Sequence, residues 1–134
     1  TKATSPRITL NLQIKFEVNH RNSLGKQGED LAIATLQKEG YFIEATNWRS
    51  GHKEIDIIAM KDDTYVFIEV KTRANTRFGQ PEMAIHEHKI HHITSAACDF
   101  LRNKKYKYIR FDVISIVIKH QQIIDYLHIK DAFY

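Results

Sequence analysis

Helical spacing of apolar positions begins at Ser23 and continues to about Glu39. Ser23 is a residue type that caps helix N-termini, and Gly40 suits the position just after the last helical residue. The inward stripe of this predicted helix consists of Ala32, Ile33 and Leu36. Glu29 lies one turn before the second of these, so we expect its carboxylate to point toward the packed side of the helix.

Three segments with high β propensity follow the helix. The pair Asp62-Asp63 separates the second segment from the third and predicts a tight hairpin turn. A loop over Arg49-Ser50-Gly51-His52 separates the first segment from the second. The predicted strands run from Tyr41 to Trp48, from Glu54 to Met60 and from Thr64 to Lys71.

Pro81 fits the first position of a second helix. Extended segments then run from Tyr108 to Ile118 and from Ile123 to Ile129. The passage from Val70 through this helix to Phe111 predicts a right-handed crossover between parallel strands. The predicted fold is therefore α/β, a mixed sheet of order αβββαβ flanked by helices, with a C-terminal hairpin. The inward face of the second helix comprises Ile90, Ile93, Ala97, Phe100 and Leu101.

The segment from Thr1 to His20 alternates apolar and polar residues, as an extra half-buried strand does. It has no partner strand nearby in the sequence. Three interpretations stay open: an added edge strand, a strand that pairs two chains into a homodimer, or sequence outside the native domain. We divide the chain into this segment, residues 1–20, and a single domain over residues 21–134. Its alternating residues are Ile8, Leu10, Leu12, Ile14, Phe16 and Val18.

Charged residues gather at one end of the predicted hairpin. If the chain turns tightly on Asp62-Asp63, Asp56 faces Glu69 across the two strands. One face of the hairpin is then entirely apolar and suited to a core. The other face is apolar near the turn and charged at its far end. The apolar face carries Ile55, Ile57, Ala59, Val66, Ile68 and Val70, and the charged end carries Glu54, Asp56, Glu69 and Lys71.

Two carboxylates opposite each other on paired strands lie about 5 Å apart at Cβ and repel. A divalent cation such as Mg²⁺ can sit between them, held by both carboxylates and a backbone carbonyl such as that of Val70. Lys71 lies on the same face ~6.6 Å beyond Glu69, where its ammonium can orient or help to deprotonate a metal-bound water and can offset charge that develops on the phosphate. The alternative is a solvated strand end whose salt bridge contributes under ~1 kcal/mol. Spacing alone supports both interpretations equally.

Asp56, twelve further residues and Glu69-Val70-Lys71 resemble the D…E-x-K signature of the restriction-endonuclease-like, PD-(D/E)XK, nuclease superfamily. A wider set of motifs resembles the YraN family of bacterial proteins, from about Asn22 to the end of the chain. These motifs are Leu24-Gly25-x-x-Gly28-Glu29, Asn47-Trp48-Arg49, Glu54-Ile55-Asp56-Ile57-Ile58-Ala59, Phe67-Ile68-Glu69-Val70-Lys71-Thr72-Arg73, Phe78-Gly79, Arg110-Phe111-Asp112-Val113 and His128-Ile129-x-x-Ala132-Phe133.

This resemblance implies a core of one helix, three antiparallel strands, a second helix and a parallel fourth strand. It also implies that Glu29, Asp56, Glu69 and Lys71 occupy active-site positions, with Mg²⁺ or Mn²⁺ as cofactor. The implied activity is endonucleolytic hydrolysis of DNA phosphodiester bonds. Archaeal-type Holliday junction resolvases share this arrangement and work as dimers, which suggests branched or damaged DNA and a homodimer. The chain departs from the signature at Ile55, where many superfamily members have proline.

The alternative function is an inactive module derived from the nuclease fold that binds nucleic acid or a protein partner. The chain has 20 Lys and Arg against 16 Asp and Glu, a net charge of +4 that suits a polyanion such as DNA. We expect phosphate contacts from Arg49, Arg73, Arg77 and Lys89. No apolar run approaches the ~18 residues that a membrane span requires, and no segment resembles a secretory signal. These features predict a cytoplasmic protein.

Other reactive residues yield weaker predictions. His88 and His92 have the i, i+4 spacing of a zinc pair, but a solvated or phosphate-facing helix is preferred for the group His86, His88, His91 and His92. Cys98 falls within the apolar pattern of the second helix and is predicted to be a buried, inert thiol. Asp112 has either a structural hydrogen bond or a place near the metal. Trp48 and Phe78 are predicted to anchor the core or a loop.

Overall fold

The helices and strands follow one another in the predicted order. The computed structural model describes residues 23–75 and 87–133, and within them the order αβββαβ with a final hairpin is confirmed. The predicted N-terminal strand, Arg77, Phe78, Pro81 and His86 lie outside the described residues. The elements are α1 (Leu24–Lys38), β1 (Phe42–Ser50), β2 (Lys53–Lys61), β3 (Thr64–Arg73), α2 (Glu87–Leu101), β4 (Tyr108–Lys119) and β5 (Gln122–Ile129).

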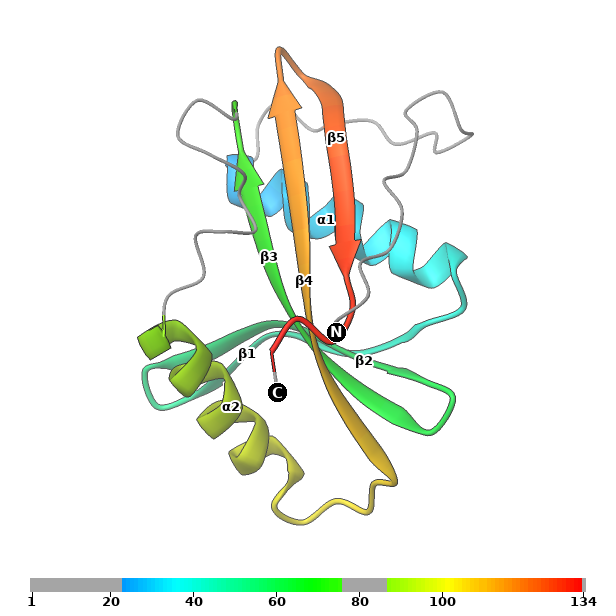
Figure 1. Ribbon diagram of the computed structural model, residues 1–134, viewed down its shortest axis with the longest axis vertical. Coiled ribbons are helices and arrows are strands. Elements are labelled where there is room, and N and C mark those ends of the chain that lie inside the picture. Colours follow the sequence, from blue (N-terminus) through cyan, green and yellow to red (C-terminus); the bar gives the residue numbers. More distant parts are fainter. Residues whose placement is uncertain (1–22, 76–86, 134) are drawn as a thin grey trace.

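The strands of the described residues form one five-stranded sheet in the order β1-β2-β3-β4-β5. Strands β3 and β4 pair in parallel, as the crossover predicted, and the other neighbouring pairs are antiparallel. The α/β fold with a mixed sheet is therefore confirmed. Figure 1 shows the strong twist of the sheet, which turns the β1–β2 hairpin away from β4 and β5.

The two helices cover opposite faces of the sheet, each over its own apolar cluster. Leu31 and Leu36 of α1 pack with Ile57, Ile68 and Ile114 in the first cluster. The inward face of α2 packs against the other face in the second cluster, and all five of its predicted positions belong there. The charged residues at one end of the β2–β3 hairpin lie between these two layers.

Local geometry explains where the elements begin and end. The Ser23 hydroxyl accepts a hydrogen bond from Lys26 N at 3.2 Å and caps α1, and Gly40 follows the helix at φ +91. Asp62 and Asp63 have φ of 51 and 59. Positive φ at both central residues is the conformation that a two-residue hairpin of type I′ requires. The predicted turn is thus confirmed.

Two predictions about the hairpin of β1 and β2 are wrong. Strand β1 extends to Ser50, so the predicted Arg49-Ser50-Gly51-His52 loop is reduced to the turn at Gly51-His52. Ile55 was predicted on the face of Ile57, but it pairs with Trp48 and belongs to the cluster under α2. The strict alternation of side chains fails between these two isoleucines, at the point where the paired register of β2 with β3 ends.

Cys98 is exposed, which corrects the prediction of a buried thiol. It lies one position beyond Ala97, at the border of the inward stripe of α2. The helical periodicity placed Cys98 near the core. It did not show that no side chain of the described residues covers the thiol on the side of the sheet. The thiol faces a hollow beside the helix.

A buried ionic network joins β4, β5 and the C-terminal turn. Asp112 has 0% exposure, and its carboxylate accepts hydrogen bonds from Arg110 Nε at 2.8 Å and from Asp131 N at 3.0 Å. His128 Nε2 lies 2.7 Å from Asp112 Oδ2. Arg110 Nη2 also donates to the Tyr41 hydroxyl at 2.8 Å. Of the two roles predicted for Asp112, the structural one is confirmed.

None of the helices within residues 23–75 and 87–133 has the length and apolar character needed to cross a bilayer.

Candidate active site

The site begins where the ladder between β2 and β3 ends. The register pairs Ile57 with Ile68 and continues to Lys61 with Thr64, which is the alignment predicted from the turn. The next pair in that register is Asp56 and Glu69. There the Asp56 Oδ2 atom accepts a hydrogen bond from Val70 N at 2.8 Å. A side chain thus satisfies the backbone amide, and the Asp56 carboxylate is fixed beside β3.

Glu69 is a buried carboxylate with an incomplete set of partners. Its side chain is only 4% exposed, and its Oε1 atom lies 3.5 Å from Lys71 Nζ and 3.5 Å from Lys89 Nζ. Its Oε2 atom is buried and has no hydrogen-bond partner within the described residues. Burying an unpartnered carboxylate oxygen is costly, so this atom calls for a proton or a cation.

The pKa values of Asp56 and Glu69 are both raised. Burial, and then the negative charge of Asp56, raise the pKa of Glu69 to about 7. Burial also raises the pKa of Asp56. A hydrogen bond between the two carboxyl groups lowers the pKa of Asp56 and raises that of Glu69. The pair therefore binds one proton more tightly than two separate carboxyl groups would, and loses it at about pH 7 when no cation is present.

Glu29 reaches the same centre from α1. Its Oε2 atom accepts a hydrogen bond from Asn47 Nδ2 at 3.3 Å. Burial, and then the charge of Asp56, raise the pKa of Glu29. Asp56, Glu69 and Lys71 thus lie together, and Glu29 lies near enough for the charge of Asp56 to raise its pKa. That these four residues form an active centre stays a prediction.

A close contact between α1 and β3 positions Glu29. A Cβ atom added at Gly28 would lie 1.8 Å from Thr72 Oγ1, so only glycine allows the helix to approach the strand this closely. Gly25, one turn earlier, has nothing within 4 Å of such an atom. The two glycines of the Leu24-Gly25-x-x-Gly28-Glu29 motif therefore have different roles.

We expect Gly28→Ala to destabilise the protein by about 1–3 kcal/mol, because the added methyl must push α1 off β3. Gly25→Ala is the matched control, and it should stabilise the helix by up to about 1 kcal/mol. Urea denaturation of both variants measures the difference. Equal stabilities for the two variants would show that the contact between Gly28 and Thr72 is not tight.

The sequence alone assigned no role to Glu54 or Asn47, which both belong to the site. The charge of Glu54 contributes to the raised pKa values of both Asp56 and Glu29. Arg49 Nη2 lies 2.8 Å from Glu54 Oε2 and is 68% exposed on its side chain. Asn47, which holds Glu29, adopts φ 48. The Asn47-Trp48-Arg49 motif marked this part of β1 in the sequence. Its spacing did not show that Asn47 would contact Glu29 of α1.

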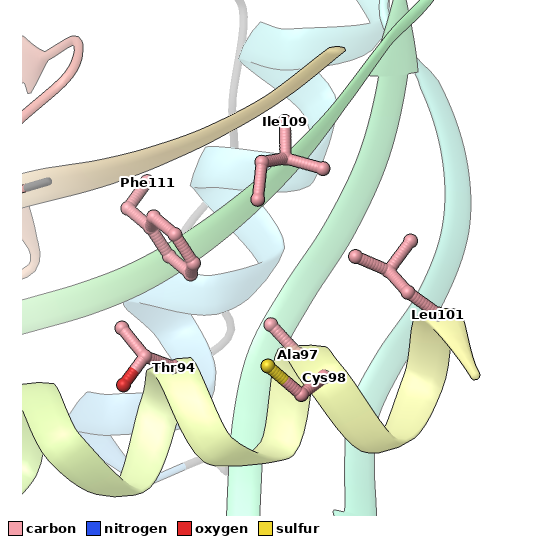
Figure 2. Close-up of a pocket in the computed structure, with 6 residues that line it drawn as sticks. All are labelled: Thr94, Ala97, Cys98, Leu101, Ile109 and Phe111. Carbon is pink, nitrogen blue, oxygen red and sulfur yellow. The ribbon is translucent and has the colours of Figure 1, made fainter. Parts of the chain in front are cut away.

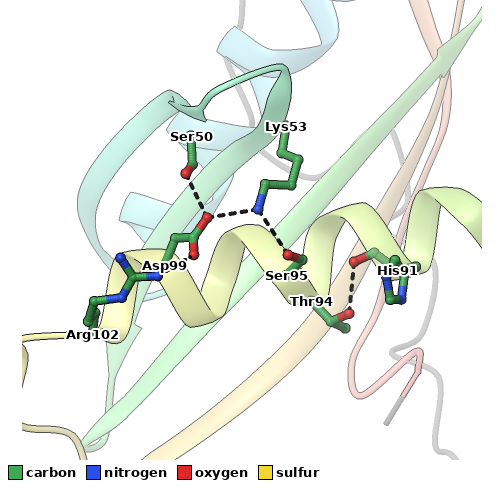
Figure 3. A network of polar contacts seen from close by, with 7 residues as sticks. All are labelled: Ser50, Lys53, His91, Thr94, Ser95, Asp99 and Arg102. Carbon is green, nitrogen blue, oxygen red and sulfur yellow. Dashed lines mark hydrogen bonds and ion pairs between the residues drawn. The ribbon is translucent and has the colours of Figure 1, made fainter.

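Helix α2 is fixed to the β1–β2 turn by a polar network (Figure 3). Lys53 Nζ lies 2.8 Å from Asp99 Oδ2 and donates to Ser95 Oγ at 2.9 Å. Ser50 Oγ donates to the same Asp99 oxygen at 2.6 Å. The side chains of the ion pair are 22% exposed, so the network is partly shielded from solvent. It fixes the helix that carries Lys89, which reaches Glu69 and for which a phosphate contact stays a prediction.

The histidines form a group beside this centre. The rings of His88 and His92 have centroids 6.1 Å apart, and those of His52 and His92 are 5.8 Å apart. Within residues 23–75 and 87–133, no three His, Cys, Asp or Glu side chains are arranged to hold a metal ion. A closed zinc site is thus not found in this part of the chain. Magnesium differs, because it binds through one or two carboxylates and keeps several waters.

The other predicted residues lie around this end of the sheet. Arg73 is exposed at the end of β3, near the carboxylates in sequence. Trp48 packs edge-on against Phe100 at 5.3 Å between ring centroids, so the prediction of a core anchor is confirmed.

The fold and the site define an α/β protein with a buried carboxylate, Glu69, a partly buried one, Asp56, and two lysines at one end of its central hairpin. The chain belongs to the family described as "Uncharacterised protein family UPF0102", the YraN family, which matches residues 28–116. It is 44% identical over 115 residues to a UPF0102 protein of Bacteroides thetaiotaomicron, covering 84% of this chain and 93% of that protein. A UPF0102 protein of Flavobacterium psychrophilum is 43% identical, with 84% and 95% covered, and one of Rhodococcus jostii is 40% identical, with 85% and 98% covered.

Proposed function

We propose that this protein is a divalent-metal-dependent endonuclease that hydrolyses DNA phosphodiester bonds, with branched or damaged DNA as its preferred substrate. One observation carries the proposal: two carboxyl groups meet in a buried site beside two lysines, and one oxygen, Glu69 Oε2, has no hydrogen-bond partner within the described residues. A pair of this kind repels itself when both groups are ionised. A cation removes the repulsion and completes the partners of the oxygen.

The residues present fit Mg²⁺ or Mn²⁺. Asp56, Glu69 and the Val70 carbonyl would hold the ion, because oxygen donors of this kind are those that hard divalent cations prefer. When bound, such an ion stabilises negative charge on the phosphate and favours hydroxide over water as nucleophile. The amide of Val70 holds Asp56 in place, which fixes one of the two carboxylates before any ligand arrives.

The chain's own residues supply the remaining functions. Lys71 lies beside Glu69 and can orient the attacking water or offset charge on the phosphate. Glu29 extends the acidic site from α1, where it can accept a hydrogen bond from water or help to hold a second ion. Arg49 and Arg73 lie at this end of the sheet and can contact phosphates on either side of the scissile bond. Dimerisation, as in the related resolvases, would place two such centres on one junction.

The test is incubation of the purified full chain with linear, flapped and four-way-junction DNA in Mn²⁺ or Mg²⁺. We expect Lys71→Ala to lower the cleavage rate by at least about 100-fold while the fold survives, since it removes a cation needed in the transition state. Lys119→Ala, an exposed lysine at the far end of β4, is the control. Absence of cleavage of every substrate by the unmodified chain would refute the enzymatic proposal.

A binding module derived from the nuclease fold is the competing function. The observation that favours it is that Lys71 and Lys89 both contact Glu69 Oε1 and thus neutralise part of the site without a metal. It predicts that Asp56→Ala leaves DNA binding intact and that Mg²⁺ does not change the melting temperature.

A further inference from the structure

An apolar groove lies between α2 and the first part of β4. Its volume is about 330 Å³, near the lower end of the range for small-ligand pockets. Figure 2 shows the helix forming one wall and the strand the other. The lining residues are Thr94, Ala97, Cys98, Leu101, Ile109 and Phe111.

The loop that borders this groove is cationic. Leu101 and Ile109 line the groove at its two walls, and the segment 102–107 connects α2 to β4. That segment includes Lys104, Lys105 and Lys107 and contains no acidic residue. All of its residues are exposed. A row of lysines without intervening acids creates a positive potential at the mouth of the groove, which suits a polyanion.

Aromatic side chains alternate with these lysines. Tyr106 is 53% exposed and Tyr108 is 58% exposed, unusually high values for large aromatic residues. Ile109, on the groove wall, is 43% exposed. Exposed aromatic rings between lysines are the arrangement that stacks unpaired bases while the cations contact phosphates.

The groove and Glu69 lie on the same face of the sheet. Phe111 lines the groove and pairs with Phe67 of β3. Glu69 lies two residues beyond Phe67, a distance of ~6.6 Å along the strand and on the same side. The positions of Phe67 and Phe111 in the cluster under α2 agree with this. A strand of nucleic acid that leaves the groove along β4 thus reaches the proposed centre within a short distance.

We infer that the groove and its cationic loop, residues 102–107, bind a single-stranded segment of nucleic acid, with one unstacked base inserted between α2 and β4. The inference rests on the proposed function for the identity of the polyanion, and it adds the class of substrate. Double-stranded DNA keeps its bases stacked and paired, so only a single-stranded segment can present a base to an apolar groove. Flapped or frayed DNA is then preferred over a continuous duplex.

Cys98 provides a direct reporter, because it is the one cysteine of the chain and its thiol is exposed on the groove wall. The experiment measures alkylation of the full chain by a neutral maleimide, in EDTA so that no DNA is cut. With oligothymidylate at ten times its Kd, we expect alkylation about tenfold slower, since the free fraction is 1/(1 + [L]/Kd). A blunt duplex of the same length should protect Cys98 much less.

Variants separate this site from general charge attraction. Replacing Lys104, Lys105 and Lys107 together with alanine should lower the slope of log affinity against log salt by about 2, because each phosphate contact on single strands contributes about 0.7. Tyr106→Ala should weaken binding by about tenfold through lost stacking. The control removes the charge from two exposed lysines elsewhere, Lys38 and Lys119, and the effects are compared per lysine removed.

The outcomes are distinct. Failure of oligothymidylate to slow alkylation, or equal slowing in the loop variant and the control variant, overturns the inference. Protection of Cys98 that depends on protein concentration alone would mean that a second copy occupies the groove, which also overturns it. Cleavage of DNA without protection of Cys98 supports the proposed nuclease function and overturns only this inference. Protection of Cys98 without cleavage supports binding in the groove and overturns the proposed nuclease function.

Discussion

Glu69→Gln is expected to make the metal-free protein more stable at pH 8 by about 3 kcal/mol, although it removes a residue of the proposed active site. The estimate follows from a pKa of about 7 for Glu69 in the folded protein against an ordinary value of 4.5, at 1.36 kcal/mol for each unit. It is an upper value, because part of the shift belongs to the pair with Asp56 rather than to one group.

The sign follows from proton binding. The folded protein binds the Glu69 proton more tightly than the unfolded chain does, so this stabilisation is fully present below about pH 4.5 and is lost as the pH rises through about 7. Above pH 7 two ionised carboxylates face each other. Glutamine carries no charge and can donate an N–H to Asp56, so the variant should lack this loss. The difference in unfolding free energy between the two proteins should therefore grow from pH 5 to pH 8.

Divalent cations should offset most of this difference in stability. Mg²⁺ or Mn²⁺ needs both carboxylates ionised, so its binding competes with the shared proton and strengthens as the pH rises. At a hundredfold excess over Kd, the ion should stabilise the unmodified protein at pH 8 by about 2.7 kcal/mol. Glu69→Gln should show little or none of this effect.

The measurement is urea denaturation at pH 5, 6.5 and 8, with EDTA and with Mg²⁺. Glu44→Gln, at an exposed position on β1, serves as control and should leave both the pH dependence and the effect of Mg²⁺ unchanged. If Glu69→Gln keeps the full stabilisation by Mg²⁺, the ion binds elsewhere. If it shows no gain at pH 8 in EDTA, the carboxylate pair is not under repulsion.

The acidic pair could be predicted from the sequence because its geometry is local. A two-residue turn at Asp62-Asp63 determines the register of the hairpin, which pairs residues as far as Ile57 with Ile68, and the next positions along the two strands are Asp56 and Glu69. The same reasoning predicted the parallel pairing of β3 with β4, because a helix between two strands of one sheet restricts how they can be joined.

Other features depend on contacts between distant segments, and the sequence could not show them. Lys89 reaches Glu69 only because α2 crosses the sheet at a particular angle, and Asn47 holds Glu29 only because β1 and α1 meet there. The helical periodicity showed that Cys98 borders the apolar stripe of α2. Whether its side chain is exposed depends on which residues of the sheet lie opposite it. The groove behind that thiol is likewise a property of how α2 and β4 meet.

The second large effect is expected far from the charged end of the hairpin. Asp112→Ala should destabilise the protein by about 3–5 kcal/mol, because it removes one partner of a buried ionic network and leaves the others unpaired. Arg110 and His128 would lose their carboxylate, and the Asp131 amide would lose its acceptor. The network connects β4 with β5 and the C-terminal turn, so loss of cooperativity in that region should accompany the fall in stability.

The pH dependence distinguishes this network from the acidic pair. Burial alone would raise the pKa of Asp112, but hydrogen bonds from His128, Arg110 and the Asp131 amide outweigh it and lower the pKa below its ordinary value of 3.8. A lowered carboxyl pKa stabilises the folded protein above the unfolded pKa, and this stabilisation is lost as the pH falls through the folded value. The difference in unfolding free energy between Asp112→Ala and the unmodified protein should therefore be constant from pH 5 to pH 8, whereas the difference for Glu69→Gln changes over the same range.

Asp131→Gly is the control, since it keeps the backbone N–H and suits the φ of 53 at that position. An Asp112→Ala protein that is destabilised no more than this control would show that the carboxylate is dispensable to the fold.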